Sequence, residues 1–285
     1  MKRILTIQDI SCLGKCSITV ALPIISAMGV EAAILPTAVL STHTMIPGFV
    51  VHDMTKNLLP ITKHWKDQNI KFDALYTGYL GSNEEIDIAL EIFDDFGSDA
   101  MIFVDPVMGD NGKLYPAFDA EYVERNKQLC ARADVIVPNI TEASLLTGMP
   151  YKETYDEAYI KELLWGLSGL GAEKILMTGV SLEKGKTGVM GLDSATGQYI
   201  RYQNDRIEGA YHGTGDIFSS VLLGGLMRGL ETYNAIRLAA DYTAETIAVT
   251  LGDDKRLWYG VNFEETISKL VSRLGDMADS RQKNR

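Results

Sequence analysis

The stretch Gly213-Thr214-Gly215-Asp216 runs directly into the apolar segment Ile217-Phe218-Ser219-Ser220-Val221-Leu222-Leu223, and it decides how the chain is interpreted. Two glycines allow a tight turn, and the apolar segment predicts a helix after it. The first turn of a helix has free N–H groups that bind an anion, and its dipole favours an ionised carboxylate. Gly213, Thr214 and Gly215 therefore predict an anion hole for a phosphoryl group, and Asp216 a general base. The alternative is a helix that simply begins after a glycine turn.

Composition indicates a globular protein. Of 285 residues, 46% are hydrophobic and 23% are charged, which is ordinary for a compact fold. The chain has 38 acidic and 27 basic side chains and a net charge of −11, which disfavours binding to nucleic acid or to an anionic membrane. We therefore expect no nucleic-acid partner and no membrane partner.

The N-terminus and the cysteines predict a cytoplasmic location. Asp9 interrupts the first apolar run before the core of a signal peptide could form, and no stretch has the roughly 20 apolar residues of a membrane helix. Three cysteines are an odd number, which fits a reducing compartment. Cys12 and Cys16 lack the second ligand pair of a structural zinc site.

Short apolar runs alternate with helical patterns along the chain. This alternation predicts an α/β fold with a mostly parallel central sheet and helices on both faces, in one domain over residues 1–285 that ends in a polar tail from about residue 276. The segment Thr187–Ile207 breaks the pattern and predicts an antiparallel hairpin. The expected strands are Ile4–Ile7, Ala33–Leu40, Ala74–Leu80, Met101–Val107, Val135–Val137 and Ile175–Thr178. The expected helices are Ser17–Met28, Glu84–Phe96, Ala120–Ala131, Thr154–Leu170, Asp216–Leu230 and Tyr233–Leu251.

Polar residues follow several of the expected strands, where open α/β sheets bind their ligands. Asp105 and Asp110 bracket a turn, and Glu142 follows Asn139 by three residues. Carboxylates at strand ends suit the magnesium ion that bridges nucleotide phosphates. The alternatives are that Asp105 only begins a turn and that Glu142 only caps a helix. Because the sequence also predicts an anion hole at Gly213–Asp216, we favour the magnesium interpretation over these two alternatives.

Other motifs are absent or ambiguous. The segment around Gly14 and Lys15 does not satisfy the P-loop pattern, and no dinucleotide fingerprint follows the first strand, so Lys15 is interpreted as a solvated loop residue. The four histidines show no metal-binding spacing, and a structural role is favoured for His43. Tyr79 stacks on a flat heteroaromatic ligand or packs in the core, and the sequence leaves both open.

These motifs, in this order and over nearly the whole chain, resemble the ribokinase superfamily and most closely its pyridoxal kinase branch, the vitamin B6 kinases. They are Gly213–Asp216, Asp105–Asp110, Pro138-Asn139 with Glu142, Gly78–Ser82 and Ser41–Thr44. The resemblance implies an ATP-dependent transfer to the 5′-hydroxymethyl group of pyridoxal, pyridoxine or pyridoxamine. It also implies Mg²⁺, in many members a monovalent cation such as K⁺, and a homodimer.

The resemblance also implies a role for each matching residue. Asp216 corresponds to the catalytic base, Gly213–Gly215 to the anion hole, and Asp105 and Glu142 to the nucleotide and magnesium carboxylates. Asn139 and Thr178 would line the nucleotide side with the acidic position Asp110, while Thr44 and Tyr79 would border the pyridine ring.

The sequence departs from the family pattern at several positions. Asp9 replaces a serine that contacts the ring, so a charged acceptor there would favour a protonated ring or an amine-bearing vitamer. Val137 and Gly179 replace a threonine and a serine that some members have on the nucleotide side, and Met45-Ile46-Pro47 changes the cover over the substrate.

Three other functions stay open at this point. A hydroxymethylpyrimidine kinase of thiamin synthesis shares the fold, the anion hole and a ring-borne hydroxymethyl acceptor. A sugar kinase is disfavoured because the N-terminal region lacks a recognisable sugar-binding pattern. A non-catalytic vitamin B6-binding protein is the alternative from a different class, and Asp216 argues against it.

Overall fold

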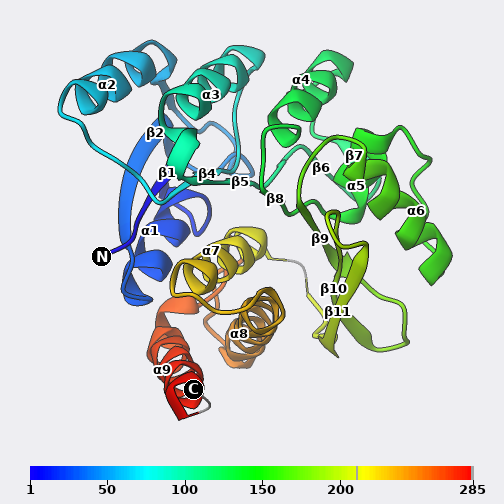
Figure 1. Cartoon of the computed structure of the whole chain (residues 1–285). Coiled ribbons are helices and arrows are strands. Elements are labelled where there is room, and N and C mark those ends of the chain that lie inside the picture. The colour runs from blue at the N-terminus through cyan, green and yellow to red at the C-terminus, as the bar shows by residue number, and fades with distance from the viewer. Residues whose placement is uncertain (210, 284–285) are drawn as a thin grey trace.

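A twisted sheet runs through the centre of the computed structural model, which describes residues 1–209 and 211–283, with side chains described up to residue 277. Within these residues nine strands form the sheet, in the order β11-β10-β9-β8-β5-β4-β1-β2-β3 (Figure 1). Six neighbouring strands are parallel: β2 (Glu31–Thr42), β1 (Arg3–Leu13), β4 (Ala74–Thr77), β5 (Met101–Val104), β8 (Val135–Ile136) and β9 (Lys174–Val180).

Both edges of the sheet are antiparallel. The short strand β3 (Val51–Asp53) pairs with β2, while β10 (Lys186–Asp193) pairs with both β9 and β11 (Gln198–Asp205). The β10–β11 pair is the hairpin that was expected over Thr187–Ile207. A separate small hairpin consists of β6 (Gly109–Asp110) and β7 (Lys113–Leu114), directly after β5 in the chain.

Helices cover both faces of the sheet (Figure 1). One face carries α2 (Thr55–Asp67), α3 (Asn83–Phe96), α4 (Ala120–Cys130), α5 (Ile140–Thr147) and α6 (Glu157–Ser168). The other carries α1 (Ile18–Ala27), α7 (Thr214–Met227), α8 (Thr232–Gly252) and α9 (Ile267–Lys283). Two single 3₁₀ turns, η1 (Gly97–Asp99) and η2 (Phe263–Glu265), complete these elements.

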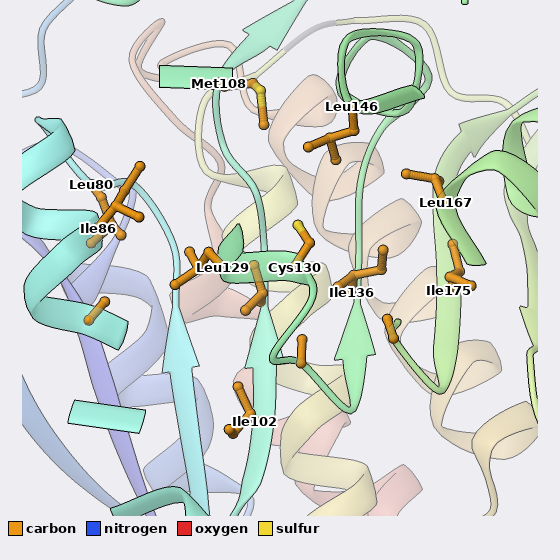
Figure 2. Close-up of a cluster of buried hydrophobic side chains, with 14 of the residues drawn as sticks. Leu80, Ile86, Ile102, Met108, Leu129, Cys130, Ile136, Leu146, Leu167 and Ile175 are labelled. Atoms are coloured by element: carbon orange, nitrogen blue, oxygen red, sulfur yellow. The ribbon is translucent and has the colours of Figure 1, made fainter. Parts of the chain in front are cut away.

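The central parallel strands are buried on both faces, because alternate side chains enter two separate cores, whereas most residues of β2 are half-buried. In β5, Ile102 and Val104 belong to the core under α2–α6, whereas Phe103 points into the core under α1 and α7–α9. Figure 2 shows the first core, where Ile136 and Ile175 of neighbouring strands lie beneath the helices. A strand buried on both sides needs a continuous apolar run, which is the pattern that predicted these strands.

The structure confirms the predicted fold class, which is α/β with a mostly parallel sheet, helices on both faces and a short antiparallel hairpin. It adds β3, α2, α9 and the β6–β7 hairpin, which the sequence did not predict, and it shows α5, which was expected only in the alternative that Glu142 caps a helix. At the C-terminus, where a polar tail is expected from about residue 276, α9 continues through Lys283. Its buried residues Leu270 and Leu274 anchor it in the second core. Arg285, the end of the expected tail, lies outside the described residues.

Among the described residues, we find no helix that combines the length and the apolar character needed to span a membrane.

Candidate active site

Helix α7 begins at a glycine that no other residue can replace unless the surrounding backbone moves. Gly213 is the N-cap residue and has a φ of 80°, in the left-handed region that glycine adopts without strain. A Cβ atom added there would lie 1.8 Å from the backbone oxygen of Lys15, in the loop after β1. Close backbone packing against this loop therefore fixes the position of the expected anion hole.

Asp216 lies in the first turn of α7 and faces the start of α1. The backbone N–H of Ser17 donates a hydrogen bond of 2.9 Å to its Oδ2 atom. Burial raises the pKa of Asp216 to about 6, and the nearby Asp9 adds to the rise, while the Ser17 bond opposes it. The carboxylate is therefore ionised at neutral pH yet close enough to neutrality to accept a proton, as a general base requires.

Asp9 is a buried carboxylate near the half-buried Asp216. It lies in β1, is only 5% exposed, and accepts hydrogen bonds from Ser17 Oγ at 2.5 Å and Ser11 Oγ at 3.1 Å. Burial raises the pKa of Asp9, and the two hydroxyl bonds oppose that shift. The residue that departs from the family pattern is thus a well-anchored acceptor beside the predicted base.

Asp105 follows β5 and is connected to the same helix. Ser219 Oγ, one turn after Asp216, donates a 2.8 Å hydrogen bond to Asp105 Oδ2. Asp105 is 8% exposed, and burial raises its pKa to about 7, with Asp216 and Asp110 adding to the rise. Helix α7 therefore contributes one carboxylate and holds a second.

Glu142 has the capping role that the sequence analysis gave as an alternative. Its Oε2 atom accepts from the N–H of Asn139 at 2.8 Å, and Asn139 Oδ1 accepts from the N–H of Glu142 at 2.9 Å, which is a complete capping box for α5. Glu142 Oε1 also accepts from the N–H of Met108 at 3.2 Å. Burial and the neighbouring Asp105 raise the pKa of Glu142 well above its usual value.

Asn139 joins the remaining nucleotide-side residues. Its Nδ2 atom donates to the carbonyl of Gly109 at 2.9 Å and to Asp110 Oδ1 at 3.3 Å, and Asn139 pairs with Thr178 as an isolated parallel bridge. Burial raises the pKa of Asp110, although a hydrogen bond from Tyr115 opposes the shift. The structure therefore brings Asp105, Asp110, Asn139, Glu142 and Thr178 into one connected group at the strand ends.

The expected magnesium residues fit a weakly held ion better than a protein cage. Among the described residues, no three His, Cys, Asp or Glu side chains form a group that could hold a metal. Both carboxylate oxygens of Glu142 already accept backbone N–H bonds, whereas Asp105 shows a hydrogen bond at one oxygen. Such a donor set suits Mg²⁺ that keeps several waters and is held largely by substrate phosphates.

The substrate-side residues lie at a different part of the site. Tyr79 follows β4 in a partly buried position, with its ring 5.5 Å from that of Phe118, and the charges of Asp9 and Glu85 add to the burial that raises its pKa to about 12. Thr44 is exposed in the turn after β2. The effect of the Asp9 charge on Tyr79 indicates that the two side chains lie in the same region, whereas Thr44 lies on the surface.

His43 is buried, in keeping with the structural role favoured from the sequence. It is 4% exposed, its Nδ1 atom accepts from the N–H of Met45 at 3.1 Å, and its ring lies 4.9 Å from that of His212, the residue before Gly213. Burial lowers the pKa of His43, with His212 adding to the effect. The loop that carries Thr44 therefore packs beside the N-terminus of α7.

One interpretation from the sequence is wrong. Lys15 is not a solvated loop residue: its side chain is 16% exposed, its Nζ atom forms a 2.8 Å ion pair with Glu264, and it lies over the ring of Phe263. The loop after β1 is pinned on one side by this pair and on the other by Gly213, so the apolar stem of Lys15 is covered.

Two site residues were missed. Ser219 is three residues after Asp216 on the same helix, and this spacing could have shown that it shares the face of α7 that looks into the site. Ser17 gave no such signal, because its importance depends on a backbone conformation that sequence patterns do not reveal.

A mostly parallel α/β sheet with a Gly-Thr-Gly-Asp turn that opens a helix beside the strand ends is the arrangement of the ribokinase-like kinases. The family model for phosphomethylpyrimidine kinase matches residues 18–257. The chain therefore belongs to this family.

Individual relatives agree with this assignment. A Bacteroides thetaiotaomicron protein, provisionally named a phosphomethylpyrimidine kinase and crystallised with pyridoxal, is 39% identical, with a TM-score of 0.89 over 94% of this chain and 95% of that one. Pyridoxal kinase from Lactobacillus plantarum is 33% identical, with a TM-score of 0.88 over 95% and 97% of the two chains. A provisionally named pyridoxal kinase of Schizosaccharomyces pombe is 29% identical over 68% of this chain, and the chain spans only 58% of the yeast protein's length.

These comparisons confirm the resemblance to the pyridoxal kinase branch and the prediction that the chain is an enzyme of the kinase class.

Proposed function

We propose that this protein is an ATP-dependent kinase that phosphorylates the 5′-hydroxymethyl group of a vitamin B6 compound. One observation carries the proposal: the Asp216 carboxylate is held by the Ser17 amide at the N-terminus of α7, next to the glycine turn that would bind a phosphoryl group. Family membership and the relative crystallised with pyridoxal support this choice of substrate.

In the proposed reaction, Asp216 accepts the proton of the substrate hydroxyl as its oxygen attacks the γ-phosphorus of ATP in line with the leaving ADP. The N–H groups of residues 213–215 receive the negative charge of the transferred phosphoryl group. Because Asp216 has a pKa of about 6, it is ionised at neutral pH before the substrate binds. No covalent intermediate with the enzyme is needed.

We assign the nucleotide side to the connected strand-end group and the ring side to Asp9 and Tyr79. Asp105 would hold Mg²⁺ with its remaining oxygen, and Glu142 would do so through water. When bound, Mg²⁺ offsets the negative charge of the phosphates. Asn139, Asp110 and Thr178 would line the nucleotide, as the family resemblance implies. The proposal also includes three roles that the family resemblance implies. Thr44 would border the pyridine ring, Gly213–Gly215 would form the anion hole, and a monovalent cation such as K⁺ would take part.

A hydroxymethylpyrimidine kinase is the second candidate, because the family model and the Bacteroides relative both carry the phosphomethylpyrimidine kinase name. The first experiment therefore incubates the purified protein with Mg-ATP and, separately, pyridoxal, pyridoxine, pyridoxamine and hydroxymethylpyrimidine, and compares kcat/KM from the phosphorylated products. We expect the highest value for a B6 compound. A higher value for hydroxymethylpyrimidine would move the protein to thiamin metabolism, and no product at all would favour a non-catalytic binding protein.

The role of Asp216 has a direct test. In Asp216→Asn the side chain keeps its size but no longer accepts a proton, so kcat should fall roughly 100- to 10,000-fold while KM for the substrate changes little. Turnover close to that of the wild type would remove Asp216 from the proposed role. Substrate binding measured by calorimetry serves as the control, because it should survive the substitution.

A further inference from the structure

Ser17 contacts two carboxylates of the site at once. Its hydroxyl donates to Asp9 Oδ1 at 2.5 Å, and its backbone N–H donates to Asp216 Oδ2 at 2.9 Å. The residue is 5% exposed. A single residue therefore connects the acceptor proposed for the substrate ring with the proposed base.

The backbone of Ser17 is held in an unusual conformation. Its φ is 51° and its ψ is −134°, a region that residues with a Cβ rarely occupy and that costs on the order of 1–3 kcal/mol. Such strain persists only where surrounding contacts hold it. Three parts of Ser17 are held here: its carbonyl accepts from the first N–H groups of α1, its N–H donates to Asp216, and its hydroxyl donates to Asp9. The bond to Asp9 is the one that its side chain supplies.

The Ser17 hydroxyl also does not cap the helix that follows it, although serine is a favoured N-cap residue. Ser17 is the N-cap residue of α1, yet its side chain makes no cap hydrogen bond to that helix. By contrast, the N-cap side chains of Ser82, Asp119 and Asp156 each accept from a backbone N–H of their own helices. The hydroxyl is directed to Asp9 instead, at the expense of the usual cap.

We propose that Ser17 is a positioning residue: its hydroxyl, anchored on Asp9, keeps its backbone N–H aimed at Asp216 and so fixes the orientation of the base. That Ser17 orients Asp216 rests on the two hydrogen bonds. That this orientation matters for catalysis rests on the proposed function.

The direction of the effect follows from the groups that face Asp216. These are the carboxylates Asp9 and Asp105, the thiol of Cys16 and the phenol of Tyr76. The Ser17 N–H bond favours the ionised form of Asp216, so its loss raises the pKa of Asp216. Removing a hydroxyl from Asp9 alone favours neutral Asp9, which lowers the repulsion and moves the pKa of Asp216 the other way or not at all.

Three variants separate the hydroxyl from the backbone. Ser17→Ala removes the anchor but keeps the strained Cβ, so the backbone should relax and the N–H should leave Asp216. Ser17→Gly removes the anchor and the strain together, because glycine tolerates this conformation, so the N–H should stay. Ser11→Ala removes the other hydroxyl donor of Asp9 and leaves Ser17 intact, which makes it the matched control.

The measurement is the titration of the Asp216 carboxyl carbon by ¹³C NMR in the ligand-free protein, with Asp216→Asn to assign the signal. We expect the midpoint to rise in Ser17→Ala and not in Ser17→Gly or Ser11→Ala. An unchanged midpoint in Ser17→Ala, or an equal rise in Ser11→Ala, would overturn the inference. If Ser17→Ala does not fold, Ser17→Cys replaces it, because its thiol is a weaker donor on the same strained backbone, and the same rise is expected.

Kinetics give an independent readout. With the preferred B6 compound, Ser17→Ala should lower kcat about tenfold and move the acid limb of the kcat–pH profile to higher pH. Ser11→Ala should change mainly KM. A wild-type protein without B6 kinase activity, but with the expected NMR shifts, would refute the proposed function and leave Ser17 as the residue that orients Asp216.

Discussion

Gly213 and Gly215 lie in one turn but meet very different surroundings. A Cβ atom on Gly213 would collide with a backbone oxygen and would require a left-handed φ, whereas a Cβ atom on Gly215 meets nothing within 4 Å. We expect Gly213→Ala to lower the free energy of unfolding by roughly 3 kcal/mol and Gly215→Ala to leave it nearly unchanged. Urea unfolding of the two variants is the measurement. Equal losses would show that the close approach to Lys15 does not restrain the turn.

Single residues also show what a sequence can and cannot reveal about a site. Asp216, Asp105 and Asn139 were predicted because each stands at a recognisable position, either the first turn of a helix or the end of a strand. The capping role of Glu142 was foreseen as an alternative, since Asn139 and Glu142 have the required spacing. The role of Ser17 could not be predicted, because it depends on an unusual backbone conformation and on a contact with Asp216, 199 residues further along the chain.

At the scale of elements, α5 connects stability to the site. Asn139→Ala removes the N-cap bond to Glu142 and the bonds to Gly109 and Asp110, so we expect a loss of about 1–2 kcal/mol in unfolding free energy and a raised KM for ATP. Asp156→Ala is the matched control, because Asp156 makes the same kind of cap on α6, at 2.9 Å to the Tyr159 N–H.

Both variants should lose the stability of one helix cap, and Asn139→Ala should lose more because its bonds to Gly109 and Asp110 go as well. Only Asn139→Ala should change the kinetics. This is measured by chemical unfolding together with the dependence of the rate on ATP concentration. A raised KM in both variants would mean that general loosening of the fold, rather than the contacts of Asn139, weakens nucleotide binding.

The helices and strands differ in how well the sequence predicts them. The strands of the parallel sheet were predicted because apolar runs buried on both faces stand out from amphipathic helices. Helix α2 was missed: it contains Pro60, and the residues it buries are only Thr55, Leu58 and Thr62. The β6–β7 hairpin has two residues in each strand, too few to show any alternation. Helix α9 was taken in part for a tail because polar residues crowd its end.

At the scale of the whole molecule, the fold brings several acidic side chains together beside the ends of the central strands, in a protein that is acidic as a whole. The chain has a net charge of −11, and Asp105, Asp216, Asp9 and Glu142 lie buried or partly buried near one another without a basic side chain among the groups that shift their pKa values. Burial and mutual repulsion both favour their neutral forms. Cations or protons that reach the site would relieve this repulsion, and the Mg²⁺ of the proposed reaction is one such cation.

This arrangement makes the stability of the ligand-free protein depend on pH. The pKa of Asp105 is raised from 3.8 to about 7 by burial, so between about pH 4 and pH 7 the folded protein keeps a proton that the unfolded chain has released. Its contribution to stability is full below pH 4 and is lost as pH rises toward 7. Asp216, raised to about 6, acts in the same direction. In EDTA, we expect the free energy of unfolding to fall from pH 5 to pH 7 by roughly 2 kcal/mol.

The variant Asp105→Asn isolates this effect, because asparagine stays neutral at every pH. Urea unfolding at pH 5, 6 and 7 should give a shallower decline for the variant than for the wild type, with the two differing most at pH 7, where the wild type carries the buried charge. Carboxylates whose pKa is lowered from the usual 3.8, such as Asp73 and Asp193, act in the opposite direction, and their contribution to stability changes only below this window. Parallel declines in the two proteins would show that Asp105 ionises without cost and that other groups, such as Asp216, cause the decline.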